Sequence, residues 1–201
     1  MTRAFLSAAI LAGIVLCGGI AAAQGVAMDP SRSAITVYAY KSGLFSAFAH
    51  DHIVEAPIQR GEVRLSGDRG VEFVVDARRM KVLDPKLSAD KRAEVQSTMH
   101  SEVLESHKYP EIRFRSTAVQ STGPAAWVVR GDLEMHGVSR PVTVTVAQSD
   151  GVFRGRAKIK QRDFGIKPVS LAGGTIKVKD EVAVEFLVRL AEDAQSIAAG
   201  R

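Results

Sequence analysis

Most of this chain alternates apolar and polar residues with a period of two. From Trp127 to His136 the apolar side chains occupy every second position, and polar or charged residues fill most of the positions between them. Successive side chains of a β-strand point to opposite faces, so this segment predicts a strand with one buried face. Similar patterns, which predict about eight antiparallel strands in all, occupy residues 35–40, 61–66, 71–78, 111–120, 142–146, 153–160 and 182–190.

One segment, residues 87–106, departs from this alternation. Apolar residues recur there at helical spacing, Ser88 is placed to cap the start, and Pro110 stops any continuation. The apolar positions that carry the helical spacing are Ala89, Ala93, Met99, Val103 and Leu104. The chain is therefore predicted to be all-β, with one helix that interrupts the strands.

Tight turns are predicted at Asp68-Arg69-Gly70 and at Asp150-Gly151, where aspartate and glycine favour hairpin geometry. Alternation alone does not choose between a sandwich and a closed barrel. Gly131, Gly155 and Ala157 lie among large residues on the inward faces. These small side chains indicate either space for a ligand inside a barrel or a local taper or bulge.

The first residues differ from the rest of the chain. Arg3 precedes an apolar run, and Ala21-Ala22-Ala23 follows a glycine-containing break, which predicts a secretory signal peptide at residues 1–23, cleaved after Ala23. The apolar run is shorter than the roughly 20 residues of a spanning helix, and we expect no transmembrane segment in the mature chain. Residues 24–201 then form a single domain with a short C-terminal tail, located in the periplasm.

Composition removes several function classes. The sole cysteine, Cys17, lies in the predicted signal, so thiol catalysis, disulfides and thiolate metal sites are excluded for the mature chain. The formal net charge is +5, with 27 Lys and Arg interspersed among 22 Asp and Glu. Because these charges form no basic stripe with interleaved aromatics, nucleic acid is not an expected partner.

Candidate chemistry is sparse. No nucleophile elbow, zinc-protease motif or dinucleotide fingerprint is present, so we expect no catalytic residues and no enzyme activity. His50 and His52 are two positions apart and would project from the same face of a strand, as two metal ligands do. The alternatives are a zinc or copper site, which would require a third ligand, or imidazoles that hydrogen-bond to the barrel mouth or to a ligand headgroup.

Four motifs in order resemble the YceI-like family of periplasmic, lipocalin-like proteins, over roughly residues 29–192. They are the segment from Met99 to Phe114, the strand-turn-strand Gly131 to Val142, Arg162-Asp163-Phe164-Gly165-Ile166, and Val178-Lys179-Asp180-Glu181-Val182. The resemblance implies an antiparallel up-and-down barrel of about eight strands, capped by a helix, with an apolar channel that holds an isoprenoid chain. His50-Asp51-His52 is similar to a sub-branch of this family.

These observations favour a periplasmic, non-catalytic binding or carrier protein for an isoprenoid or other amphiphilic lipid of the quinone or polyprenyl-phosphate type. We expect no cofactor beyond this ligand, His50 and His52 at the headgroup or mouth, and transient contact with inner-membrane respiratory proteins. The alternative is a metal-binding protein or metal-dependent enzyme centred on His50 and His52. The residues predicted to line the apolar cavity are Ile35, Val37, Phe45, Phe48, Phe73, Val75, Phe114, Trp127, Leu133, Met135, Phe153, Ile159 and Phe186.

Overall fold

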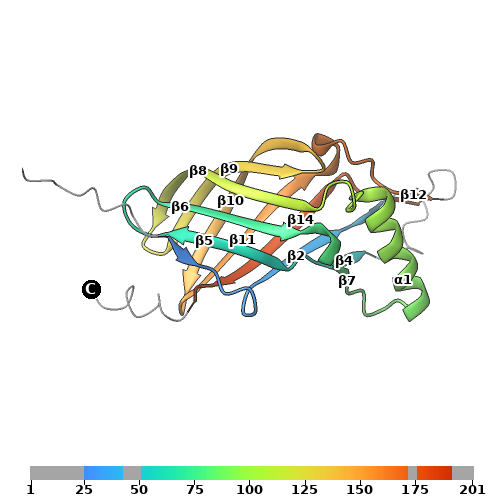
Figure 1. Ribbon diagram of the computed structural model, residues 1–201, viewed down its shortest axis with the longest axis horizontal. Helices are drawn as coiled ribbons and strands as arrows, with labels where there is room; N and C mark the ends of the chain where they lie inside the picture. Colours follow the sequence, from blue (N-terminus) through green and yellow to red (C-terminus); the bar gives the residue numbers. More distant parts are fainter. Residues whose placement is uncertain (1–24, 43–50, 172–175, 192–201) are drawn as a thin grey trace, which may run out of the picture.

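One long antiparallel sheet curls around a central axis, with a single helix across one end (Figure 1). The computed structural model describes residues 25–42, 51–171 and 176–191. The long strands are β2 (Ala34–Ala39), β4 (His52–Glu55), β5 (Ile58–Arg64), β6 (Gly70–Asp76), β8 (Glu111–Gly123), β9 (Ala126–Met135), β10 (Val138–Ser149), β11 (Val152–Lys160) and β14 (Glu181–Arg189). Short strands are β1 (Val26–Ala27), β3 (Lys41–Ser42), β7 (Lys81–Val82), β12 (Ser170–Leu171) and β13 (Ile176–Val178).

The sheet curls into a barrel, and one segment of the chain that is interrupted between two strands joins its two sides. β4 pairs with β2, whereas β5 pairs with β6, and only Ala56 and Pro57 separate β4 from β5 along the chain. Consecutive strands from β6 through β8, β9, β10, β11 and β14 to β2 pair antiparallel, and the chain itself joins β4 to β5, so the sheet curls round on itself. This is the predicted up-and-down barrel, and the sandwich alternative is excluded.

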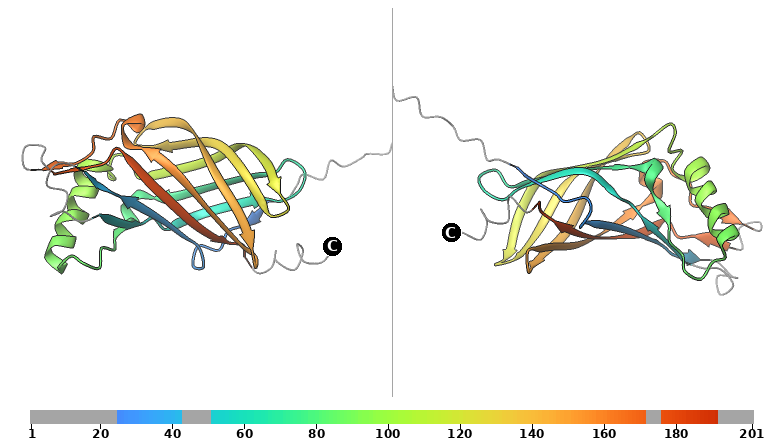
Figure 2. Two further views of the ribbon diagram at one scale, coloured as in Figure 1. Left: turned by 180° about the vertical axis from the view of Figure 1, so that it is seen from behind. Right: turned by 60° about the horizontal axis from the view of Figure 1, so that its bottom comes forward.

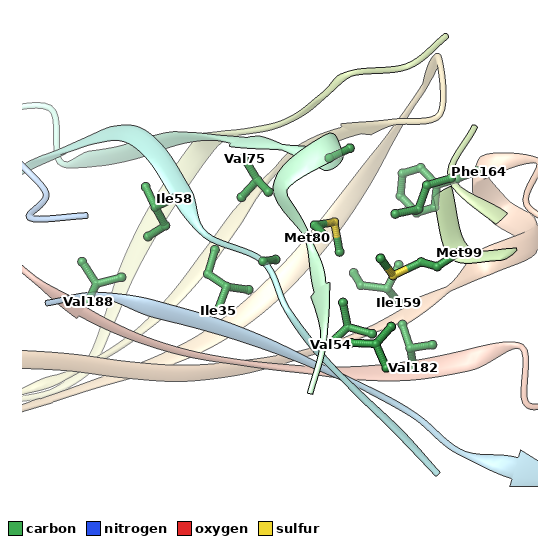
Figure 3. Packing of buried hydrophobic residues seen from close by; sticks show 14 of the residues in the cluster. Ile35, Val54, Ile58, Val75, Met80, Met99, Ile159, Phe164, Val182 and Val188 are labelled. Atoms are coloured by element: carbon green, nitrogen blue, oxygen red, sulfur yellow. The ribbon is translucent and has the colours of Figure 1, made fainter. Parts of the chain in front are cut away.

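The predicted alternation places apolar side chains inside the ring. Trp127 on β9 pairs with Val146 on β10, and Phe153 on β11 pairs with Val188 on β14, with all four side chains in one hydrophobic cluster. Figure 3 shows Ile35, Ile58 and Val188, which come from three different strands, among the buried side chains of this interior.

The two ends of the barrel are built differently. The helix end carries α1 (Ala89–Thr98), the π-helical turn η3 (Met99–Val103), the 3-10 turns η2 (Ala77–Arg79) and η4 (Gln161–Phe164), and the small sheet of β12, β13 and β3. The hairpin end carries the turns between β5 and β6, β8 and β9, and β10 and β11. Both views of Figure 2 show α1 lying across the helix end, away from these hairpins.

The predicted tight turn at Asp150-Gly151 is confirmed. Ser149 pairs with Val152, and Asp150 and Gly151 have φ of 53° and 71°. Two successive positive φ values are those of a type I′ hairpin, whose twist matches that of the flanking strands.

The helix is shorter than the predicted segment 87–106. Ser88 caps it as expected, because its hydroxyl accepts a hydrogen bond from the Lys91 amide at 3.4 Å. The α-helix ends at Thr98, and η3 continues the chain only to Val103. Ala89 and Ala93, two of the apolar positions of the predicted helical pattern, are exposed because α1 lies outside the barrel end and buries none of its own residues. Among the described residues, no helix is long and apolar enough to cross a membrane.

The inward glycines do not leave empty space. A Cβ on Gly131 would lie 2.6 Å from the Phe114 ring, and a Cβ on Gly155 would collide with the Phe186 ring. These glycines therefore let two aromatic rings lie flat against the barrel wall, a close approach that any larger residue would prevent.

Candidate functional site

A large apolar cavity occupies the barrel interior. Its volume is about 1170 Å³, above the roughly 300–1,000 Å³ of ordinary small-molecule pockets. Strands from all around the barrel contribute to its wall, and residues from both the helix end and the hairpin end line it. The cavity therefore extends from the helix end of the barrel to the hairpin end.

The predicted lining residues lie where the alternation placed them. Every one that the structure describes is in the cavity wall: Ile35, Val37, Phe73, Val75, Phe114, Trp127, Leu133, Met135, Phe153, Ile159 and Phe186. Phe45, Phe48 and His50 lie outside the described residues. Contact of these side chains with a ligand stays a prediction.

Sequence reasoning missed the apolar wall at the helix end. Val54, Met80, Met99 and Val182 also line the cavity, and Figure 3 shows them grouped near Ile159. Met80 and Met99 belong to no regular strand, so alternation gave no signal for them. Their positions follow from the way η2 and η3 fold over the barrel rim.

His52 is the polar group of greatest interest in the wall. It begins β4, lines the cavity, and keeps its side chain 25% exposed. Its Nδ1 lies 2.6 Å from Oδ2 of Asp84, while Oδ1 of the same carboxylate accepts a hydrogen bond from the Ile53 amide at 2.5 Å. The Asp84 carboxyl group thus bridges the His52 ring and the main chain of Ile53.

Asp84 holds His52 from a buried position. Its relative exposure is only 2%, and its main-chain carbonyl accepts a hydrogen bond from Nη1 of Arg92 on α1 at 3.0 Å. Sequence reasoning missed Asp84, because 32 residues separate it from His52. The only local signal is its place next to Pro85, between the predicted strand 71–78 and the predicted helix 87–106.

The charged residues in the cavity wall are mostly basic. At the helix end they are Lys41, Lys91, Lys177 and Glu94; at the hairpin end they are Arg64 and Arg69. Glu94, the one carboxylate in this lining, bonds to Lys91 at 2.8 Å on the same face of α1. The wall thus holds more positive than negative charge at both ends.

Two other histidines form hydrogen bonds that join segments of the helix end. His100 bonds through Nδ1 to the Ser106 hydroxyl at 3.0 Å and through Nε2 to the Gln96 side chain at 2.5 Å. His136 bonds to Glu105 at 2.7 Å and to the carbonyl of Phe164 at 3.2 Å. Over residues 25–42, 51–171 and 176–191, no group of three or more metal-ligating side chains comes together.

Comparison with known proteins places this fold and cavity in context. Residues 27–190 match a family model described as YceI-like domain. An UPF0312 protein of Pseudomonas putida (strain GB-1) is 36% identical over 95 residues, covering 42% of this chain and 48% of the relative. An UPF0312 protein of Shewanella denitrificans is 34% identical over 92 residues, covering 41% and 48%. The matched regions span about half the length of these relatives.

The barrel also resembles solved structures. The crystal structure of BcnA from Burkholderia cenocepacia superposes with a TM-score of 0.59 at 18% identity, covering 82% of this chain and 99% of that one. A YCEI protein of Campylobacter jejuni covers 96% of this chain at 13% identity, with a TM-score of 0.45. At such identity the similarity to BcnA supports the fold alone.

Proposed function

This chain belongs to the YceI-like domain family, and we propose that it is a non-catalytic binding protein for an isoprenoid or similar amphiphilic lipid. The observation that carries this proposal is the cavity of about 1170 Å³ inside the barrel. Its wall consists largely of Val, Phe, Leu, Ile and Met side chains contributed by strands that are far apart in the sequence.

Such a wall suits a long hydrocarbon tail. Burial of apolar surface contributes roughly 25 cal/mol per Å², and the tail needs no directional contacts to gain it. A continuous wall with few polar groups therefore favours a flexible apolar chain over a polar metabolite. The specific tail, quinone or polyprenyl phosphate, is part of this proposal.

We place the protein in the periplasm, with residues 1–23 removed as a signal peptide and residues 24–201 as the functional domain. In this location it would carry a water-insoluble ligand through an aqueous compartment, in transient contact with inner-membrane respiratory proteins. The barrel would supply the shielding that the ligand lacks in water.

The single tryptophan provides a direct assay. Trp127 lines the cavity, and its ring centroid lies 6.1 Å from that of Phe153, so geranylgeraniol in the barrel should change its emission. Ala157→Phe, which enlarges an inward side chain of the wall, should weaken binding. Ala147→Phe makes the same change at an exposed position on β10 and should bind like the parent protein.

The proposal is abandoned if geranylgeraniol leaves the emission unchanged and native mass spectrometry of protein purified from its own periplasm finds no bound amphiphile. Equal loss of binding in Ala147→Phe and Ala157→Phe would also contradict it, because only one of these substitutions enters the cavity.

The second candidate function is metal binding through His50 and His52. It is favoured by the contact between His52 Nδ1 and Asp84, since metal-binding imidazoles commonly bond a carboxylate through the second ring nitrogen. Measurement of zinc and copper content in the parent protein and in a double alanine variant of His50 and His52 tests it. Unchanged metal content removes this candidate.

A further inference from the structure

We propose that the helix end of the barrel carries a docking surface for an anionic lipid bilayer. This surface, the rim patch, lies on the outside of β2, β4 and β7 and consists of Tyr38, Tyr40, Ile53 and Leu83 (Figure 1). The inference goes beyond the proposed function, because the rim patch lies outside the cavity and needs no ligand there.

The strand register assembles the rim patch. Ala183 on β14, Tyr38 on β2 and Ile53 on β4 are direct cross-strand neighbours. Leu83 continues this row beyond β7, because its amide donates a hydrogen bond to the Ile53 carbonyl at 2.8 Å. Neighbouring strands lie about 4.8 Å apart, so the apolar row is roughly 14 Å long. Tyr40 follows two positions after Tyr38 and extends the row toward the helix end.

The side chains of the rim patch point out of the barrel. The residues that alternate with them along the strands line the cavity instead: Val37, Ala39, His52, Val54 and Val82. Among the residues that the structure describes, only Tyr40 and Leu83 are exposed large hydrophobic side chains, with relative exposures of 38% and 45%. Although they are far apart in the sequence, both belong to this one surface.

A polar row borders the rim patch on the side of the hairpin end. It lies two residues further along each strand, and its members are cross-strand neighbours in this order: Arg156, Glu185, Thr36, Glu55 and Lys81. The outer surface of the barrel thus changes from polar to apolar within two residues, toward the helix end. A barrel that meets a membrane with its helix end can insert the apolar row and keep the charged row in water.

Two lysines beside the exposed apolar side chains supply positive charge. Nζ of Lys179 lies 5.9 Å from the centroid of the Tyr40 ring, and Lys86 is exposed three residues after Leu83. In the described part of the chain neither lysine forms an ion pair. Lysines next to inserted apolar groups keep their ammonium groups at the headgroup level, where anionic lipids attract them.

The carboxylates near the rim patch are engaged elsewhere. Glu181 bonds to Lys158 at 3.0 Å, and Oδ1 of Asp51 accepts a hydrogen bond from the Lys41 amide at 2.9 Å. Glu55 belongs to the polar row, opposite a lysine of β7. The charge left beside the apolar row is therefore positive, which complements phosphatidylglycerol headgroups.

A bilayer fits the rim patch better than a protein partner does. A stable protein interface buries about 800 Å² on each partner, and four side chains in little more than one row offer far less. Tyrosine combines an apolar ring with a polar hydroxyl, which suits the boundary between headgroups and acyl chains. The same strands form the cavity wall on their inner face, so docking would bring the helix end of the cavity to the membrane.

The test is flotation of ligand-free protein, purified from its own periplasm, with lipid vesicles. We expect binding to vesicles of phosphatidylethanolamine and phosphatidylglycerol, and about tenfold weaker binding to vesicles of phosphatidylcholine. Leu83→Ser and Tyr40→Ser should each weaken the binding about tenfold, because each removes an inserted apolar side chain. Lys179→Gln should weaken it about fivefold, and only with the anionic vesicles.

Leu187→Ser is the matched control. Leu187 also points outward, on β14, but it pairs with Ala34 and Arg154 toward the hairpin end. The same substitution there should leave vesicle binding as in the parent protein. Thermal unfolding of Leu83→Ser and Tyr40→Ser should match that of the parent protein, because both side chains are exposed.

Four results would overturn the inference. They are absence of binding to the anionic vesicles, equal binding to phosphatidylcholine, equal loss in Leu83→Ser and Leu187→Ser, and a parent dimer that Leu83→Ser converts to a monomer in analytical ultracentrifugation. The last result would make the rim patch an interface between two copies. Ala157→Phe should still float, since it alters only the cavity, so failure of the proposed ligand binding is distinguishable from failure of membrane docking.

Discussion

Gly155 on β11 lies directly opposite Phe186 on β14, and the phenylalanine ring covers the space where a Cβ would stand. The same missing Cβ would also lie 2.5 Å from the carbonyl oxygen of Thr145 on the other neighbouring strand. Because Gly155 has no side chain, the Phe186 ring lies along the barrel wall at this point instead of projecting into the cavity.

Gly155→Ala should force the Phe186 ring toward the cavity. Overpacking of this kind typically costs about 1–3 kcal/mol of stability, and the displaced ring should also weaken binding of a long apolar ligand. Chemical denaturation and Trp127 fluorescence measure the two effects. Gly123→Ala is the control, since the nearest atom to its added Cβ is Ala126 Cβ at 3.8 Å; equal effects at both glycines would contradict the packing argument.

Gln96 ties α1 to the barrel rim. Its side-chain amide donates to the Met80 carbonyl at 2.8 Å, and its side-chain oxygen accepts from the Val82 amide at 2.7 Å. Gln96→Leu should leave the Met80 carbonyl and the Val82 amide without this side-chain partner, and should lower the free energy of unfolding by about 1–3 kcal/mol. Amide hydrogen exchange in α1 should then be faster than in the parent protein.

Ser97→Ala changes the next, exposed position of α1 and should leave hydrogen exchange as in the parent protein. If Gln96→Leu exchanges no faster than Ser97→Ala, the helix is held by other contacts than this amide.

Asp76 should contribute to stability in a pH-dependent way. Hydrogen bonds from the Arg78 side chain, at 2.9 and 2.8 Å, lower the pKa of Asp76 below its ordinary value of 3.8. A carboxyl whose pKa is lower in the folded state stabilises the fold above its unfolded pKa, and this contribution disappears as the pH falls below 3.8 toward the folded value.

Asp76→Asn should therefore lower the free energy of unfolding by on the order of 1 kcal/mol at neutral pH, partly because it weakens the cap of η2. The difference in this free energy between the variant and the parent protein should become smaller in acid. Denaturant unfolding at neutral pH and at about pH 3 measures this. Asp68→Asn, at an exposed turn, is the control. A difference that grows in acid would have the wrong sign for a lowered pKa.

His136 should stabilise the helix end through its ring. It occupies the first position of a type I′ turn, with φ of 54°, and its side chain is only 13% exposed between Glu105, Phe164 and Tyr109. Asparagine tolerates this backbone conformation but does not reach both partners, so His136→Asn should lower the free energy of unfolding by about 1–2 kcal/mol.

Asp150→Asn makes a comparable change in the other type I′ turn, at φ of 53°, where the side chain is exposed. Thermal unfolding of the two variants should differ clearly. Similar midpoints would mean that the turn conformation, and not the buried contacts of His136, determines the stability at this position.

The sequence by itself determined which side of each strand faces inward. Alternation is a local property, because strand geometry turns every second side chain to the same face. For this reason Trp127, Phe153 and Phe186 were placed in the cavity wall from the sequence pattern, and the structure puts all three there. The absence of cysteine from residues 24–201 likewise needed no structure.

Other features depended on contacts between distant residues. The break at Ala56 and Pro57 closes the barrel because β4 and β5 find different partner strands, which no local pattern specifies. The pairing of His52 with Asp84 arises only when β7 brings the loop after it beside β4.

The role of the inward glycines was also decided by tertiary structure. From the sequence, Gly155 was compatible with open space or with a bulge, but the facing strand fills its place with the Phe186 ring. Local periodicity thus specified the two faces of the sheet, while long-range pairing and packing decided how the barrel closes, what fills its wall, and which polar groups meet inside it.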